Sequence, residues 1–219
     1  MQKHTRIALI VEDYYCEAYR ILTSKVWPDR VRGYPLRKNK SIPATRKLRE
    51  WIHQCKDKYD FVLVLVDLDT PAHNKDPEYF RKLRRICADE GAALLVVKRE
   101  LESWILADVD SIARWKKLGG STSLKVYHNT ARNPWEPKKE ILKLVRQIDR
   151  KKKRLPQSYD PAWTERIAAR VSFSDSVLER NSSLRCFYDL VRGCAGDEGR
   201  RHFAEYPPKT HCNSAEIPD

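Results

Sequence analysis

Residues 61–69 have the sequence FVLVLVDLD, in which a continuous apolar run is followed at once by two aspartates, Asp67 and Asp69. The run is rich in β-branched residues, has the usual length of a strand, and shows no polar face. Strands that are apolar on both sides are typical of the centre of a parallel sheet. We therefore predict a buried strand over residues 61–66 that ends at a pair of acidic side chains.

Two further apolar runs, residues 7–11 and 92–97, have the same character, and residues 31–34 are expected to add a short strand. Apolar residues at helical spacing lie between these runs, in the stretches 16–23, 44–55 and 77–87. Strands that alternate with helices predict an α/β fold with a mainly parallel sheet and helices on both of its faces.

From about residue 115 onward, the sequence shows only helical periodicity. We expect three parts: an α/β core over residues 1–114, a helical C-terminal extension over residues 115–194 that packs on the core, and a flexible tail over residues 195–219.

The chain has 219 residues and a formal net charge of +13. Clustered Lys and Arg gain affinity for polyanions by displacing counterions, so DNA or RNA is the leading candidate partner. Arg37, Lys38 and Lys40 lie in a basic loop that is suited to following a phosphate backbone without reading bases. Alternatively, the charge only maintains solubility or fits an acidic partner subunit.

Six cysteines are scattered without a C-x-x-C pair and without histidines at zinc-finger spacing, so neither a structural zinc site nor a disulfide scaffold is indicated. No apolar run approaches 18 residues, and the N-terminal stretch lacks the layout of a signal peptide. We expect a cytoplasmic protein that does not enter a membrane.

Acidic residues follow the predicted strands: Glu12, Asp67, Asp69 and, slightly later, Glu102. Ligands of parallel sheets bind beyond the carboxyl ends of the strands, which is where these acids are expected to lie. Magnesium prefers such hard oxygen ligands and keeps several waters, so two or three carboxylates are enough when phosphates complete its coordination. In the alternative interpretation, each acid only caps the helix that follows it.

The pair Val11-Glu12, the run Leu65 to Asp69 and the segment Glu100 to Asp108 resemble, in order and spacing, the TOPRIM fold of primases, topoisomerases and OLD-type nucleases. More closely, the chain resembles a family of small bacterial TOPRIM proteins in which a Glu-Leu-Glu-Ala-Trp-Leu-Leu-Ala-Asp segment follows the last core strand. The segment here differs mainly at Ser103 and Ile105.

The resemblance continues at Pro137-Lys138 and at Ser182-Ser183-Leu184, so it covers roughly residues 5–192. The chain departs from the family at Asp13, where the family commonly has glycine, and at Glu17, a slightly displaced second acid.

For this family, the resemblance implies metal-dependent hydrolysis of phosphodiester bonds with Mg²⁺ or Mn²⁺. Glu12 would be a general base or acid, or a ligand; Asp67 and Asp69 would hold the ion, and Glu102 would support a second one. Lys138 would neutralise the transition state. The resemblance also implies a role as effector of an antiphage defence system, beside an ATPase partner, with a homo-oligomer as a further possibility.

Two other functions are consistent with the sequence. A degenerate TOPRIM subunit would bind an ATPase or nucleic acid without turnover. A HAD-like phosphatase would use Asp67 and Asp69 as its aspartate pair, although Pro71 stands where that family has Thr or Val. The sequence contains no G-x-x-x-x-G-K-[ST] loop, so any use of ATP would belong to a partner.

Overall fold

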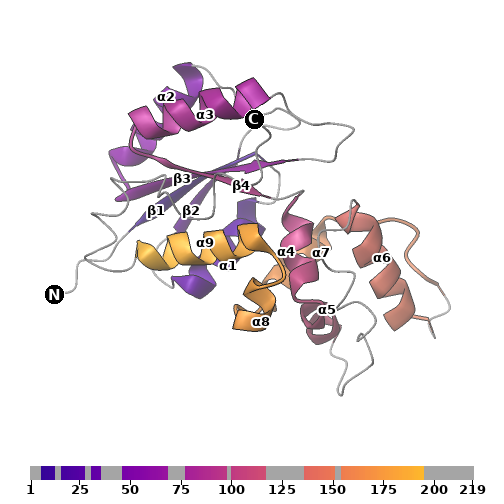
Figure 1. Cartoon of the computed structure of the whole chain (residues 1–219). Helices are drawn as coiled ribbons and strands as arrows, with labels where there is room; N and C mark the ends of the chain where they lie inside the picture. Colours follow the sequence, from indigo (N-terminus) through magenta and orange to yellow (C-terminus); the bar gives the residue numbers. More distant parts are fainter. Residues whose placement is uncertain are drawn as a thin grey trace.

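The computed structural model shows an α/β fold in which four parallel strands lie between two layers of helices (Figure 1). It describes residues 6–12, 16–27, 31–35, 46–68, 77–97, 100–116, 136–150 and 154–194.

The sheet consists of β1 (Ile7–Val11), β2 (Val31–Pro35), β3 (Phe61–Asp67) and β4 (Ala93–Val97). The strand order is β2-β1-β3-β4, and all three pairs are parallel. The predicted parallel sheet is thus confirmed. β3 extends one residue further than predicted because Asp67 still pairs with Val97 of β4.

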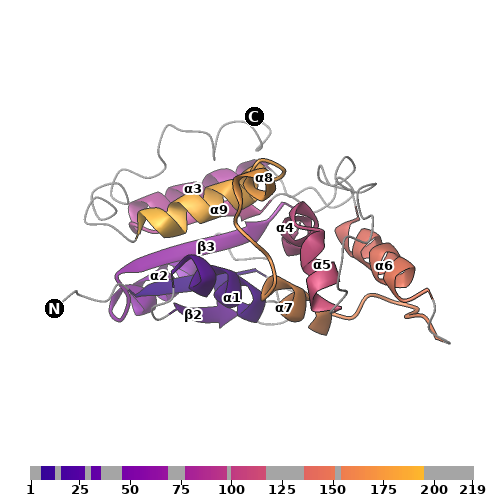
Figure 2. The ribbon, with the colours of Figure 1, turned by 90° about the horizontal axis from the view of Figure 1, so that it is seen from below.

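Alternate residues of each strand point to opposite faces, and this period divides the core into two clusters. Even-numbered residues of β1, β3 and β4 pack against α2 (Arg46–Lys56) and α3 (Pro77–Asp89). Odd-numbered residues of the same strands pack toward α1 (Cys16–Val26) and α9 (Ser182–Gly193). Figures 1 and 2 show these two helical layers on the two sides of the sheet.

Beyond β4, the described elements are all helices, and those after about residue 115 were predicted from the periodicity. The elements are α4 (Leu101–Ala107), α5 (Asp110–Trp115), α6 (Pro137–Ile148), α7 (Ala162–Ala168), α8 (Asp175–Leu178) and α9. Both α7 and α9 contact α1, and α9 also contacts β4. Residues from both sides of position 114 therefore belong to one hydrophobic cluster, the one on the α1 side of the sheet.

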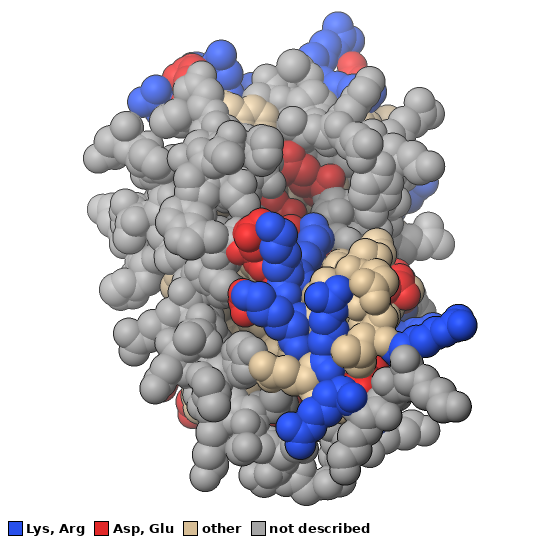
Figure 3. All heavy atoms as spheres, turned by 90° about the vertical axis from the view of Figure 1, so that its right-hand side faces the viewer, with Lys and Arg blue, Asp and Glu red and all other residues tan. Residues whose placement is uncertain are grey.

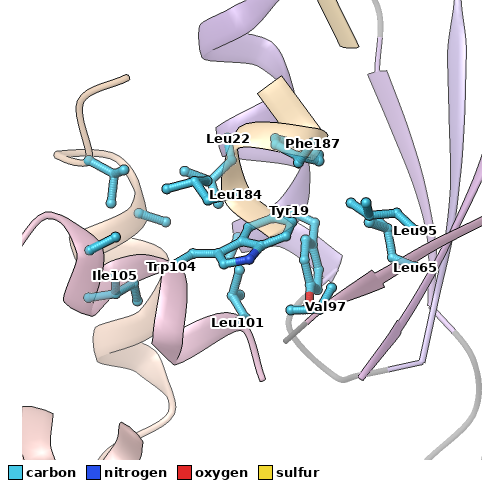
Figure 4. Packing of buried hydrophobic residues seen from close by; sticks show 14 of the residues in the cluster. Tyr19, Leu22, Leu65, Leu95, Val97, Leu101, Trp104, Ile105, Leu184 and Phe187 are labelled. Carbon is cyan, nitrogen blue, oxygen red and sulfur yellow. The ribbon is translucent and has the colours of Figure 1, made fainter. Parts of the chain in front are cut away.

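Trp104 lies at the centre of this cluster and has no exposed surface. Its ring meets Tyr19 edge-on and Phe187 at a tilt, and its indole N–H donates a hydrogen bond to Ser183 Oγ at 2.8 Å (Figure 4). Trp104 is therefore a core residue and is not available to stack on a nucleic-acid base.

Several other predictions bear on the fold. None of the helices in the described ranges combines the length and the hydrophobicity needed to span a membrane. The thiols of Cys16, Cys55, Cys87 and Cys194 are free and buried. Cys186 is in a disulfide bond, which the cysteine spacing did not predict.

Some predicted features lie outside the described residues. These are the basic loop with Arg37, Lys38 and Lys40, the acidic residue Asp69, and the tail over residues 195–219. The domain boundary at residue 114 stays a prediction.

Candidate functional site

The strand order reverses between β1 and β3, which are neighbours in the sheet. From β1 the chain moves outward to β2, and then it returns past β1 to β3 and on to β4. Right-handed crossovers place the helices of the two directions on opposite faces, as observed for α1 against α2 and α3. At such a reversal, α/β proteins bind ligands beyond the carboxyl ends of the two strands, and this position is here called the crevice.

Two of the predicted acids meet at this crevice. Glu12 follows β1, and its backbone N–H donates to Leu65 O at 3.0 Å, which continues the pairing with β3. Asp67 ends β3, and its backbone N–H donates to Glu12 Oε2 at 3.1 Å. Asp67 is 9% exposed. The structure therefore brings the side chain of Glu12 to the residue that carries the second carboxylate.

Tyr19 of α1 also belongs to this group, although sequence reasoning did not select it. Its hydroxyl donates to Asp67 Oδ1 at 3.2 Å, and the residue is buried. The signal was present in the helical spacing: Cys16, Tyr19 and Leu22 share the inward face of α1. A buried tyrosine hydroxyl needs a hydrogen-bond partner, and here that partner is a candidate metal ligand.

A second acidic group lies where α4 begins, just beyond β4. Lys138, near the start of α6, donates to Glu100 Oε2 at 2.5 Å, and its Nζ lies 4.0 Å from Glu102 Oε2. Glu102 has no exposed surface, whereas the Lys138 side chain is 38% exposed. Lys138 thus neutralises two carboxylates in this arrangement, and Glu100 is a site residue that sequence reasoning missed.

The C-terminal helices complete the surroundings of Glu102. Thr164 of α7 donates from Oγ1 to Glu102 Oε1 at 3.3 Å, and the Thr164 hydroxyl is itself hydrogen-bonded to the hydroxyl of Tyr159. Buried carboxylates require such donors and a cation, because the charged form is strongly disfavoured without them. Glu102 therefore depends on helices that follow the α/β core in the sequence.

Asp108, the last acid of the family-like segment, has a structural role. Its Oδ2 accepts hydrogen bonds from the guanidinium of Arg114 at 2.5 Å and from the backbone and hydroxyl of Ser172 at 2.7 and 3.0 Å. These contacts join α4 and α5 to the loop before α8, so Asp108 is not part of the candidate site.

Basic side chains gather on the face of the molecule where α6 lies, next to a group of Asp and Glu side chains (Figure 3). Helix α6 carries four cationic residues, Lys138, Lys139, Lys143 and Arg146. Lys139 and Lys143 pair with glutamates one turn away, Glu136 and Glu140. Positive and negative charges thus lie together near the carboxyl end of the sheet.

The donors at the crevice fit a hard cation, because Glu12 and Asp67 offer carboxylate oxygens, the ligand type that Mg²⁺ and Mn²⁺ prefer. Within the ranges that the structure describes, no group of three or more His, Cys, Asp or Glu side chains is arranged to hold a metal ion. A site built on this pair would thus need further oxygen ligands, such as water, substrate phosphate or Asp69.

Comparison with known proteins finds no matching family model, no matching curated protein and no matching solved structure.

Proposed function

We propose that the chain is a TOPRIM-type nuclease that uses Mg²⁺ or Mn²⁺ to hydrolyse phosphodiester bonds in DNA or RNA. One observation carries the proposal: Asp67 and Glu12, at the ends of adjacent strands, are joined by a hydrogen bond at the strand-order reversal. Parallel sheets bind their ligands at this position, and two acids that converge there form the start of a hard-metal site.

The residues at the crevice would have different roles in phosphodiester hydrolysis. A divalent ion, when bound, stabilises negative charge on the phosphoryl oxygens. Glu12 and Asp67 would hold the ion, and the carboxylate of Glu12 would also be able to accept the proton of the attacking water.

The charge of the protein favours a polyanionic substrate. A net charge of +13 attracts nucleic acid, and the cations of α6 lie on a face that also carries acidic groups. Binding through phosphates is sequence-independent and weakens as salt concentration rises. The substrate strand would therefore be held by its phosphate backbone. Any ATP hydrolysis would belong to a partner subunit, because the sequence has no G-x-x-x-x-G-K-[ST] loop.

The test uses the full-length chain with supercoiled plasmid and with single-stranded RNA, in Mg²⁺, in Mn²⁺ and in EDTA. We expect metal-dependent cleavage that falls by more than about 100-fold in Asp67→Asn, because loss of a ligand should cost more than the roughly 10- to 100-fold caused by loss of a ligand's hydrogen-bond partner. Asp57→Asn is the matched control, because Asp57 is exposed and lies between α2 and the start of β3, away from the carboxyl ends of the strands. Equal cleavage by both variants would show that the activity does not come from this site.

A binding subunit without turnover is the second candidate, and the second acidic group favours it. Lys138, the residue proposed to stabilise the transition state, already contacts Glu100 and Glu102, and Glu102 is fully buried. In the same experiment, a chain that binds Mn²⁺ and nucleic acid but leaves both substrates intact would support this second function.

A further inference from the structure

We propose that Tyr19 is a positioning residue, whose hydroxyl orients the carboxylate of Asp67 for binding a divalent cation. This inference rests on the proposed function, and it assigns a role in the site to a side chain of α1, a helix that packs on the sheet.

A hydrogen bond from Tyr19 fixes the orientation of the Asp67 carboxylate. The phenol of Tyr19 donates to Asp67 Oδ1 at 3.2 Å between two buried residues. The terminal torsion of an aspartate is broad and roughly two-fold, so a free carboxylate samples many orientations. A fixed donor on one oxygen selects one of them, because rotation of the carboxylate would break the hydrogen bond.

The donor, the Tyr19 phenol, is held rigidly by aromatic neighbours. The Tyr19 ring meets the Trp104 ring edge-on, with centroids 5.5 Å apart and planes at 89°. Trp104 is in turn fixed by the tilted ring of Phe187, with centroids 4.8 Å apart, and by its hydrogen bond to Ser183. Figure 4 shows Tyr19 beside Trp104, between α4 and the strands that carry Leu65 and Val97.

A second hydroxyl in the same helix, that of Thr23, has a different kind of partner. Thr23 is also buried, and its hydroxyl donates to Tyr19 O at 2.8 Å, within α1. That is the usual local solution for Ser and Thr, whose hydroxyls lie close to the backbone, whereas a tyrosine hydroxyl lies at the far end of its ring and must find its partner elsewhere. The Tyr19 hydroxyl instead donates across the fold to an acid at the crevice, as expected of a group that orients a ligand.

The test is the variant Tyr19→Phe, which removes the hydroxyl and keeps the ring that packs on Trp104. Binding of Mn²⁺ to the full-length chain is measured by electron paramagnetic resonance. Loss of a hydrogen-bond partner of a metal ligand typically weakens affinity about 10- to 100-fold, and we expect a loss in that range. Tyr188→Phe is the matched control, because within the described residues its hydroxyl accepts from Arg192, one turn away at 3.3 Å, and does not contact an acid of the candidate site.

A double variant separates positioning from a general loss of structure. If Tyr19 acts through Asp67, Tyr19→Phe causes no further loss of Mn²⁺ affinity in the Asp67→Asn background, whereas independent effects would add. Mn²⁺ should also broaden the ring signals of Tyr19, and not those of Tyr188, in spectra of the wild-type chain. This last measurement requires no variant to fold.

The outcomes distinguish the two proposals. If Asp67→Asn weakens Mn²⁺ binding and Tyr19→Phe does not, the role of Tyr19 is overturned and the proposed metal site stands. A wild-type chain that binds no Mn²⁺, or one in which Mn²⁺ leaves the Tyr19 signals sharp, overturns the role of Tyr19. The first of these two results would also remove the metal-dependent function.

Discussion

Glu102 is an acidic side chain without exposed surface, so its charge must be compensated by its neighbours. Lys138 Nζ lies 4.0 Å from Oε2, and the hydroxyl of Thr164 donates to Oε1 at 3.3 Å. Removing one partner of a buried charge costs more than the interaction itself contributes, because the remaining group is left desolvated and without a partner. Thr164 should therefore matter for stability.

We expect Thr164→Val to lower the free energy of unfolding by about 1–3 kcal/mol, because it removes a donor to a buried carboxylate while keeping the side-chain shape. Thr164→Ser should restore most of the loss. Urea unfolding followed by circular dichroism measures both values.

Thr23→Val provides the comparison, since the Thr23 hydroxyl donates to a carbonyl of its own helix and not to a buried carboxylate. Its loss should be the smaller of the two. A larger loss at Thr23 than at Thr164 would contradict the importance of the hydrogen bond to Glu102.

The sequence predicted part of the site because two of its acids, Glu12 and Asp67, stand where apolar strands end. Tyr19 and Thr164 were not predicted, because each lies in an amphipathic helix, where a single hydroxyl has no local signature. Their partners are 48 and 62 residues away in the chain. Only the packing of α1 and α7 against the core determines which acid each hydroxyl meets.

At the scale of elements, the strands were predicted well because an apolar run without a polar face is a strong local signal. The ends of helices were predicted less well. Val171 continues the apolar spacing of α7, but the helix ends at Ala168, and Val171 instead packs in the core from the loop that follows. Helix ends depend on caps and tertiary contacts, and the spacing of apolar residues carries no information on either.

The start of α9 depends on one buried residue, Asn181. Its Oδ1 accepts from the backbone of Leu184 at 3.0 Å and from Ser183 Oγ at 2.8 Å, and its Nδ2 donates to Ser103 Oγ at 3.3 Å. It is therefore both the N-cap of α9 and a link to α4.

We predict that Asn181→Ala lowers the free energy of unfolding by about 2 kcal/mol, the upper end of the range for loss of an N-cap. Asn181→Ser keeps a capping oxygen but loses the link to Ser103, so it should show an intermediate loss. Urea unfolding gives both values. An alanine variant as stable as the wild type would show that α9 is positioned by its apolar face alone.

At the scale of the whole molecule, alternation of strands and helices predicted a parallel sheet but not the strand order. The order β2-β1-β3-β4 arises from pairing between segments 24 to 54 residues apart, such as Val11 with Leu65. Local periodicity contains no information on such pairs. The order matters for function, because it makes β1 and β3 neighbours and thereby brings Glu12 to Asp67.

Buried thiols throughout the core should make the free energy of unfolding depend on pH in the alkaline range. Burial raises the pKa of the thiols of Cys16 and Cys55 from 9.0 to about 11, and of Cys87 and Cys194 from 9.0 to about 12. Between these values, the unfolded chain releases thiol protons that the folded chain keeps. The free energy of unfolding therefore falls as pH rises above 9.0, and below it the contribution is fully present.

Each thiol that ionises only in the unfolded chain contributes a slope of about 1.4 kcal/mol per pH unit. We predict that Cys87→Ala makes the decline between about pH 9.5 and 11 shallower by this amount, since the residue lies within the α2–α3 side of the core. Urea unfolding at several pH values measures the slope, and any constant loss from the smaller side chain cancels because it shifts all points equally. Ionisation of lysines and tyrosines is common to both proteins. Equal slopes in the two proteins would mean that the Cys87 thiol ionises as readily in the folded chain as in the unfolded one, which its burial between helix and sheet argues against.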